Sequence, residues 1–156
     1  MKKTVAVIGS RGAIGNAVVD TLLADESVEA VFKFSRAEIT EHDDKVKHIF
    51  IDIEDEESIK QATESLPEDT KFDLIFVATG ILHDEKNVFP EKSIKDISFD
   101  KLIKVLTINT IGPTLVGKYF IPYLRKDSKS TFPFLSARVG SISDNQLGGW
   151  YSYRAS

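Results

Sequence analysis

A glycine-rich turn near the amino terminus limits the possible folds of this 156-residue chain more than any other feature. An apolar run at residues 5–8 precedes the turn, and from Ile14 onward apolar residues recur every three to four positions. The run is typical of a strand buried on both faces, and the spacing predicts an amphipathic helix. At such a junction glycines let the backbone turn tightly beside a pyrophosphate at the helix N-terminus. We therefore expect nucleotide binding, with a simple packing turn as the alternative, at Gly9, Ser10, Arg11, Gly12, Ala13, Ile14 and Gly15.

Strand-like and helix-like segments alternate along the rest of the chain. Short apolar runs predict further strands at residues 30–34, 48–51, 72–78 and 132–135. Helical spacing predicts one helix over residues 54–66 and a longer one that Asp100 caps. This alternation predicts the α/β class, with a doubly wound parallel sheet of the Rossmann type, about five strands and right-handed crossovers. The length predicts a single domain, residues 1–156.

Charge and cysteine content exclude several kinds of function. Twenty Lys and Arg face 24 Asp and Glu, so no basic field would gather the phosphates of a nucleic acid. The absence of cysteine excludes disulfides, thiolate metal sites and cysteine nucleophiles. No apolar run approaches the roughly 20 residues of a membrane-spanning helix, and no third ligand accompanies His83 and Asp84. We expect a cytoplasmic protein with no metal and with neither a membrane nor a nucleic acid as partner.

The end of the second predicted strand bears on the choice of cofactor. Most dinucleotide folds that select NAD place an acid there, about 20 residues after the turn, to hold the ribose 2′-hydroxyl. This chain has Ser35 and Arg36 instead. Because an arginine suits a 2′-phosphate, and Arg11 adds a second positive charge, we expect NADP rather than NAD. Asp52 and Ile53, after the third strand, could meet the adenine; helix capping by Asp52 is the alternative.

Two segments of the carboxy-terminal half carry a family resemblance. They read Ser-Ala-Arg-Val-Gly-Ser-Ile-Ser at residues 136–143 and Gly-Gly-Trp-Tyr-Ser-Tyr-Arg-Ala-Ser at residues 148–156. With the glycine turn they resemble the short-chain dehydrogenase/reductase family, most of all its C-factor and sniffer-like carbonyl reductases. The resemblance spans the whole chain. It implies an NADP-dependent oxidoreductase that moves a hydride between nicotinamide and a small carbonyl or alcohol substrate, and a homo-oligomer. A non-catalytic dinucleotide-binding or sensing module and an epimerase of the extended branch are the alternatives.

The resemblance also assigns roles to single residues. Asp52-Ile53 and Ala78-Thr79-Gly80 match the family's cofactor-binding segments after the third and fourth strands, the second of them loosely. Tyr153 matches the tyrosine of the family's Tyr-x-x-x-Lys motif, whose lysine would be the next residue after Ser156. Tyr153 is then the acid that protonates the substrate oxygen, and Ser141, or else Ser136, donates a hydrogen bond to it. The family's usual serine aligns with Ala137.

Asn109 is a candidate from spacing as well as from the resemblance. It follows Leu102 by seven residues and Leu106 by three, which places its amide on the sheet-facing side of the long helix. Pro113, four residues later, has no N–H for the Asn109 carbonyl, so that carbonyl can hold a water and the helix is expected to bend. In the family such a water helps relay protons. A kinked helix with a buried, satisfied amide is the alternative.

The chain is short for a member of this family. The resemblance therefore implies the first part of a longer protein, in which the carboxy-terminal strands of the sheet are still to come. A phenol with an ordinary pKa near 10 is a poor acid at neutral pH, and in the family the lysine and the nicotinamide charge lower it. We therefore expect the 156 residues alone to be inactive, with Tyr153 on a frayed stub too short to form a helix.

Overall fold

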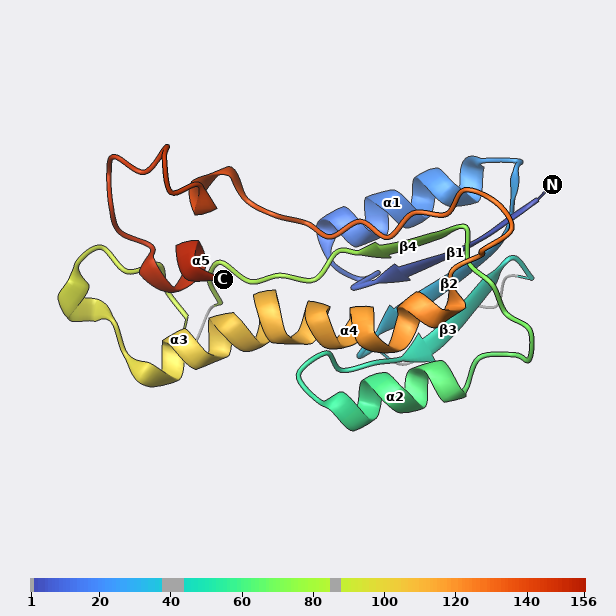
Figure 1. The fold of residues 1–156 in the computed structure, drawn as a ribbon, viewed down its shortest axis with the longest axis horizontal. Helices are drawn as coiled ribbons and strands as arrows, with labels where there is room; N and C mark the ends of the chain where they lie inside the picture. Colours follow the sequence, from blue (N-terminus) through green and yellow to red (C-terminus); the bar gives the residue numbers. More distant parts are fainter. Residues whose placement is uncertain (1, 38–43, 85–87) are drawn as a thin grey trace.

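The computed structural model describes residues 2–37, 44–84 and 88–156, and a parallel sheet lies at its centre (Figure 1). The strands run in the order β3-β2-β1-β4. Their bounds are Lys3–Ile8 for β1, Val28–Ser35 for β2, Val46–Phe50 for β3 and Leu74–Val77 for β4. The helices are α1 (Ala13–Ala24), α2 (Glu56–Glu64), α3 (Phe99–Leu106), α4 (Gly112–Phe120) and α5 (Tyr151–Ala155). The predicted fold class, a doubly wound parallel sheet, is confirmed.

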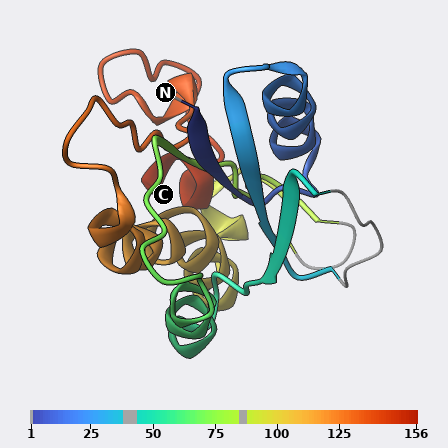
Figure 2. The same ribbon diagram turned by 90° about the vertical axis from the view of Figure 1, so that its right-hand side faces the viewer.

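Helices cover both faces of the sheet, as the unbroken apolar run of the first strand predicts. Val5 and Val7 of β1 pack toward α1, in a cluster that includes Val19. Ala6 and Ile8 point the other way, into a larger cluster with α2 and α4. Figure 2 shows α1 on one side of the sheet and α2 and α4 on the other. Because alternate residues of β1 enter different clusters, every side chain from Val5 to Ile8 is buried.

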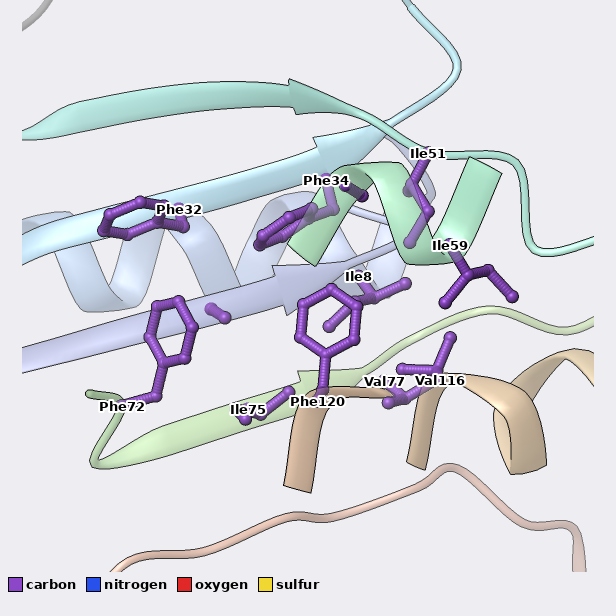
Figure 3. Packing of buried hydrophobic residues seen from close by; sticks show 12 residues of the cluster. Ile8, Phe32, Phe34, Ile51, Ile59, Phe72, Ile75, Val77, Val116 and Phe120 are labelled. Carbon is purple, nitrogen blue, oxygen red and sulfur yellow. The ribbon is translucent and has the colours of Figure 1, made fainter. Parts of the chain in front are cut away.

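Aromatic side chains fill the cluster beneath α2 and α4. The rings of Phe34 and Phe120 meet edge to face with their centroids 5.1 Å apart, and those of Phe32 and Phe72 do the same at 5.2 Å. Figure 3 shows these rings and the neighbouring isoleucines pointing toward one another. Each such pair adds about 0.5–1.5 kcal/mol beyond the burial of area, so this face anchors α4 firmly against the sheet.

The predicted fifth strand, residues 132–135, is an extended segment that pairs with β4 only through isolated bridges. The N–H of Thr131 donates to the Asp73 carbonyl, and the N–H of Leu135 donates to the Val77 carbonyl. Between these two donors stands Pro133, which has no N–H to give. The ladder is therefore interrupted, and the regular sheet among the described residues has four strands rather than five.

The long predicted helix consists of α3 and α4 joined by a π-helical turn, Thr107–Ile111. Ser98, not Asp100, caps it, because the Ser98 hydroxyl accepts from the Lys101 N–H at 3.4 Å. The N–H of Gly112 donates to the Thr107 carbonyl, five residues back. A Cβ at Gly112 would lie 2.7 Å from the Ile53 carbonyl oxygen, so only glycine fits this close approach. The disturbance expected from Pro113 thus takes the form of a wide turn centred on Asn109.

The carboxy-terminal stub forms a short helix, α5, contrary to the expectation that it would fray. Figure 1 shows α5 lying beside α3. Asn109 donates from Nδ2 to Ser156 Oγ at 2.9 Å, and the Thr110 hydroxyl donates to the Ser156 carbonyl at 2.8 Å. A five-residue helix is unstable alone, so these bonds from the π-helical turn help hold it.

Candidate active site

The glycine turn and the segment after β4 meet at the carboxyl end of the sheet, where the strand order reverses between β1 and β4. Gly9 has a left-handed φ of 84°, and a Cβ there would lie 2.9 Å from Thr79 Cγ2. A Cβ at Gly15 would lie only 2.2 Å from the Gly9 carbonyl oxygen. Both glycines are therefore required by close backbone approach. This switch point is where open parallel sheets bind nucleotides.

One cavity, of about 430 Å³, opens between the glycine turn and the ends of β2 and β3. Most of the residues predicted to bind the cofactor line it: Gly9, Arg11, Gly12, Ser35, Arg36, Asp52, Ile53, Ala78, Thr79 and Gly80. The predicted residues Ser10, Ala13, Ile14 and Gly15 lie outside its lining. Ser10 is fully buried, and its hydroxyl donates to the Phe34 carbonyl at 3.2 Å. Ser10 thus fastens the turn to β2 instead of facing the cavity.

A cluster of three charges borders this cavity. Arg36 Nη1 lies 3.7 Å from Glu54 Oε1, and Lys104 Nζ of α3 lies 2.5 Å from Glu54 Oε2. The Arg36 side chain is 68% exposed, so its weak pairing with Glu54 leaves it accessible to an anion. Asp52 turns back on its own loop, where Oδ1 accepts from the Glu54 N–H at 3.0 Å. The cavity lining therefore carries two arginines, Arg11 and Arg36, and two carboxylates, Asp52 and Glu54, at the predicted 2′-phosphate end.

A second cavity, of about 370 Å³, adjoins the first and shares residues 78–81 with it. It is lined by Ile14 from α1 and by the candidate catalytic residues Asn109, Ser136 and Tyr153. Ala137 lines it too, whereas Ser141 lies outside. The Ser141 hydroxyl is 3.3 Å from that of Ser143 and accepts from the Asp144 N–H. The structure thus brings together three of the four predicted catalytic residues and leaves Ser141 in a neighbouring exposed turn.

Asn109 ties the second cavity together. Its Oδ1 accepts from the Ile81 N–H at 2.7 Å, and its Nδ2 donates to the Ile81 carbonyl at 2.9 Å. The amide therefore pairs with the backbone of the segment after β4 as a neighbouring strand would. Because Nδ2 also reaches Ser156, one side chain aligns the cavity wall with the end of α5.

The composition of the two cavities fits a dinucleotide. Where they meet, the buried Thr79 Oγ1 has no hydrogen-bond partner among the described residues. A buried hydroxyl without a partner is costly unless a ligand satisfies it. The glycine cradle, this hydroxyl and the two arginines are together suited to a phosphate-containing ligand that extends from one cavity into the other.

Comparison with known proteins agrees with this geometry. The family described as short chain dehydrogenase matches residues 3–156. The chain belongs to the short-chain dehydrogenase family. A relative from Rhodococcus sp. (strain AD45), 1-hydroxy-2-glutathionyl-2-methyl-3-butene dehydrogenase, is 28% identical over 98% of this chain. This short-chain dehydrogenase sequence spans 64% of that relative's length.

Solved structures of this short-chain dehydrogenase fold superpose on nearly the whole chain. The NADPH-bound carbonyl reductase from chicken fatty liver is 25% identical, with a TM-score of 0.80, and is matched over 99% of this chain and 65% of its own. The carbonyl reductase Sniffer of D. melanogaster is 18% identical with a TM-score of 0.83, over 99% and 69% of the two chains. The family prediction is confirmed, and the second likeness shows a shared fold.

Two structural features are absent from the part of the molecule that the structure describes. Within residues 2–37, 44–84 and 88–156, no helix is long and apolar enough to cross a membrane. In the same ranges no three His, Asp or Glu side chains gather where they could hold a metal ion.

Some residues around the site of this short-chain dehydrogenase were missed in the sequence. Glu54 and Lys104 lie 50 residues apart, and only the fold brings them together. Glu91 is buried, with 3% of its surface exposed, and contacts Ser152 beside Tyr153. An acid in a polar segment such as residues 91–98 resembles any solvated charge, so no sequence signal marks Glu91. Arg154 could have been found, because it directly follows the candidate tyrosine.

Proposed function

We propose that the protein is an NADP-dependent oxidoreductase that interconverts a small carbonyl compound and its alcohol. The observation that carries this proposal is the position of Tyr153, Ser136 and Asn109 around one cavity that runs on into the glycine turn. Membership of the short-chain dehydrogenase family supports oxidoreductase chemistry in general. The second cavity, close to the tyrosine and the serine, is then the substrate end.

The chain's own residues divide the work at that end. A nicotinamide dinucleotide, when bound, supplies or accepts the hydride. Tyr153 holds a proton at its phenol oxygen and donates it to the substrate oxygen, or takes it back in the reverse direction. Ser136 donates a hydrogen bond to the same oxygen and so stabilises the charge that develops on it. Asn109 positions both walls of the cavity through Ile81 and Ser156.

The choice of NADP rests on the charges at the other end. Arg36 and Arg11 line the cavity beside Ser35, where an NAD-selecting fold would have an acid. Glu54 lies near Arg36, but it is shared with Lys104, so a 2′-phosphate can compete for the guanidinium. The chicken carbonyl reductase, whose structure contains NADPH, has the same fold.

The full-length gene product should be tested with NADPH and a panel of aldehydes and ketones. We expect turnover, and we expect Tyr153→Phe to lower kcat by at least about 100-fold, because the acid is lost. Binding of NADPH, followed by its fluorescence, should stay unchanged in this variant. Normal turnover by Tyr153→Phe would contradict the role of the tyrosine. NADPH binding without turnover on any substrate would favour the non-catalytic binding module, for which the presence of Ala137 in the cavity already argues.

The homo-oligomer implied by the resemblance and the cytoplasmic location expected from the composition remain proposals. Phe99 and Ile103, one helical turn apart on α3, are 76% and 43% exposed, which suits contact with a second copy. Light scattering of the full-length gene product should give a mass of two or four chains. A monomer at micromolar concentration would contradict the oligomer.

A further inference from the structure

A buried carboxylate contacts the helix that carries the candidate catalytic tyrosine. Glu91, in the segment between β4 and α3, accepts at one carboxylate oxygen from the Ser152 hydroxyl. Its other carboxylate oxygen accepts from the Ser152 N–H at 3.3 Å. The Glu91 backbone carbonyl accepts from the Trp150 N–H at 2.7 Å. Glu91 therefore holds the first turn of α5 through three hydrogen bonds.

Arg154 holds the other side of Tyr153. Its Nη1 donates to the Val139 carbonyl at 2.6 Å, and its Nε donates to the Gly149 carbonyl at 2.9 Å. A third bond, at 3.3 Å, joins Nη2 to the Gly148 carbonyl. The residues immediately before and after Tyr153 are thus both anchored, although α5 has only five residues.

The backbone that leads into α5 is left-handed at three successive positions. Gly148, Gly149 and Trp150 have φ values of 64°, 68° and 53°. Glycine adopts this region freely, but a bulky residue such as tryptophan is strained there. A Cβ at Gly149 would lie 3.1 Å from the Glu91 carbonyl oxygen, so glycine also permits the close approach of Glu91. Strain of this kind persists only where surrounding contacts enforce it, and Glu91 supplies such contacts.

A buried charge needs a reason to be retained. Burial opposes the ionised form of Glu91, but the hydrogen bonds from Ser152, one from the Glu91 backbone N–H and the nearby Lys101 charge together outweigh it and lower the pKa of Glu91 below the ordinary value. The two Ser152 donors meet different oxygens of the carboxylate, and a neutral amide cannot reproduce this arrangement because an NH2 donor replaces one of the two oxygens. The charge is therefore matched to the two donors at the start of α5.

We propose that Glu91 is a positioning residue that sets the orientation of Tyr153 by fixing the left-handed turn and the first residues of α5. This inference rests on the proposed role of Tyr153 as the acid. Glu91 does not line the cavity of Tyr153, so it acts through Ser152 and Trp150. Its loss leaves the glycine turn and the cofactor end of the site intact, because those are held by separate contacts.

The test compares Glu91→Ala, Glu91→Gln and Ser152→Ala in the full-length gene product. We expect kcat to fall about 100-fold in Glu91→Ala and about tenfold in Glu91→Gln, because a small misplacement of a catalytic group is costly. Glu91→Gln keeps one acceptor, which explains the partial rescue. The dissociation constant for NADPH should stay within about twofold of the parent in all three variants.

Asp96→Asn is the matched control. Asp96 lies in the same segment, and its carboxylate accepts from the Lys92 and Ser93 N–H groups instead of from α5. We expect its kcat within about twofold of the parent. Equal losses of kcat in Asp96→Asn and Glu91→Ala, or an unchanged kcat in Glu91→Ala, would overturn the proposal.

Amide hydrogen exchange of residues 148–156, measured by mass spectrometry, tests the same contact without turnover. Exchange there should be at least about tenfold faster in Glu91→Ala than in Asp96→Asn, because the anchoring bonds are gone. If the parent shows no turnover, faster exchange still supports the anchoring of α5 and places the failure in the proposed function. Equal exchange rates in the two variants would overturn the anchoring itself.

Discussion

The two ends of the site are held by different kinds of contact. At the cofactor end the decisive contacts are made by backbone, where Gly9 and Gly15 allow atoms to approach within distances that a side chain would forbid. At the substrate end they are made by side chains from distant segments, such as Glu91 with Ser152 and Asn109 with Ser156. The residues of the cofactor end therefore lie close together in the sequence as a local motif. The residues of the substrate end come together only after the chain has folded.

The largest effect is expected from Gly15→Ala at the cofactor end. Its Cβ would lie 2.2 Å from the Gly9 carbonyl oxygen, so the turn must open. We expect a loss of about 3 kcal/mol in the free energy of unfolding and no measurable binding of NADPH. Gly12→Ala is the control, because its Cβ would meet only the Gly9 oxygen at 3.4 Å. Urea unfolding of both variants checks the difference, and equal stability would refute it.

A smaller effect, confined to the substrate end, is expected from the two candidate serines. Ser136→Ala should lower kcat about 100-fold, as the loss of one donor to a developing oxyanion does. Ser141→Ala should leave kcat nearly unchanged, because Ser141 lies outside the cavity and bonds within its own turn. Steady-state kinetics with a carbonyl substrate decide between them. The reverse pattern would restore the preference for Ser141 drawn from the sequence.

A still smaller effect should separate the two cofactors. Arg36→Asp removes the exposed guanidinium beside the cavity and should weaken NADPH binding about tenfold while favouring NADH. Glu54→Gln should act in the opposite direction, because it frees Arg36 from its partner. Fluorescence titration with each cofactor measures both shifts. Equal affinity of the parent for NADPH and NADH would sink the idea.

The smallest effect concerns the contact of α2 with α4, away from both ends. Hydrogen bonds from Lys118 and Tyr119 lower the pKa of Glu56. The hydrogen bond between Lys118 and Glu56 also raises the pKa of Lys118. The Glu56 carboxylate stabilises the fold above its unfolded pKa near 4.5, and this contribution fades as the pH falls through its lower folded value. Glu56→Gln should therefore lower the midpoint of thermal unfolding slightly at pH 7 and by less at pH 3. The same difference at both pH values would contradict the assignment.

The sequence predicted the parts of the fold that depend on local pattern. The glycine turn, the buried run before it and the alternation of strand and helix were enough to place β1, α1 and the order of elements. The prediction of a regular fifth strand was wrong because Pro133 interrupts its hydrogen bonds to β4. The sequence shows that Pro133 has no N–H, but it does not show which residue of β4 lies opposite. The helical state of residues 151–155 was missed because it depends on anchors at Glu91, Asn109 and Thr110.

The candidate site followed the same division. The cofactor residues came from the motif, and all but Ser10, Ala13, Ile14 and Gly15 line the first cavity, while Ile14 lines the second. Ser10 and Gly15 are buried within the turn, whereas Ala13 is exposed and faces neither cavity, and a one-dimensional motif does not contain this distinction. The choice between Ser136 and Ser141 depends on how residues 136–144 fold, because only Ser136 lines the cavity. The number of residues between each serine and Tyr153 does not reveal that fold.

The π-helical turn between α3 and α4 gives this part of the chain a fixed length. Removing one residue from Thr107–Ile111 would restore a regular helix and rotate everything after it by about 100°. Val116 and Phe120 would then leave the core, or Asn109 would turn away from Ile81 and Ser156. Insertions and deletions should accumulate in the surface loops of homologous chains and avoid these five positions. The five positions set the rotation of α4, which packs in the core, relative to α3 and Asn109 at the site.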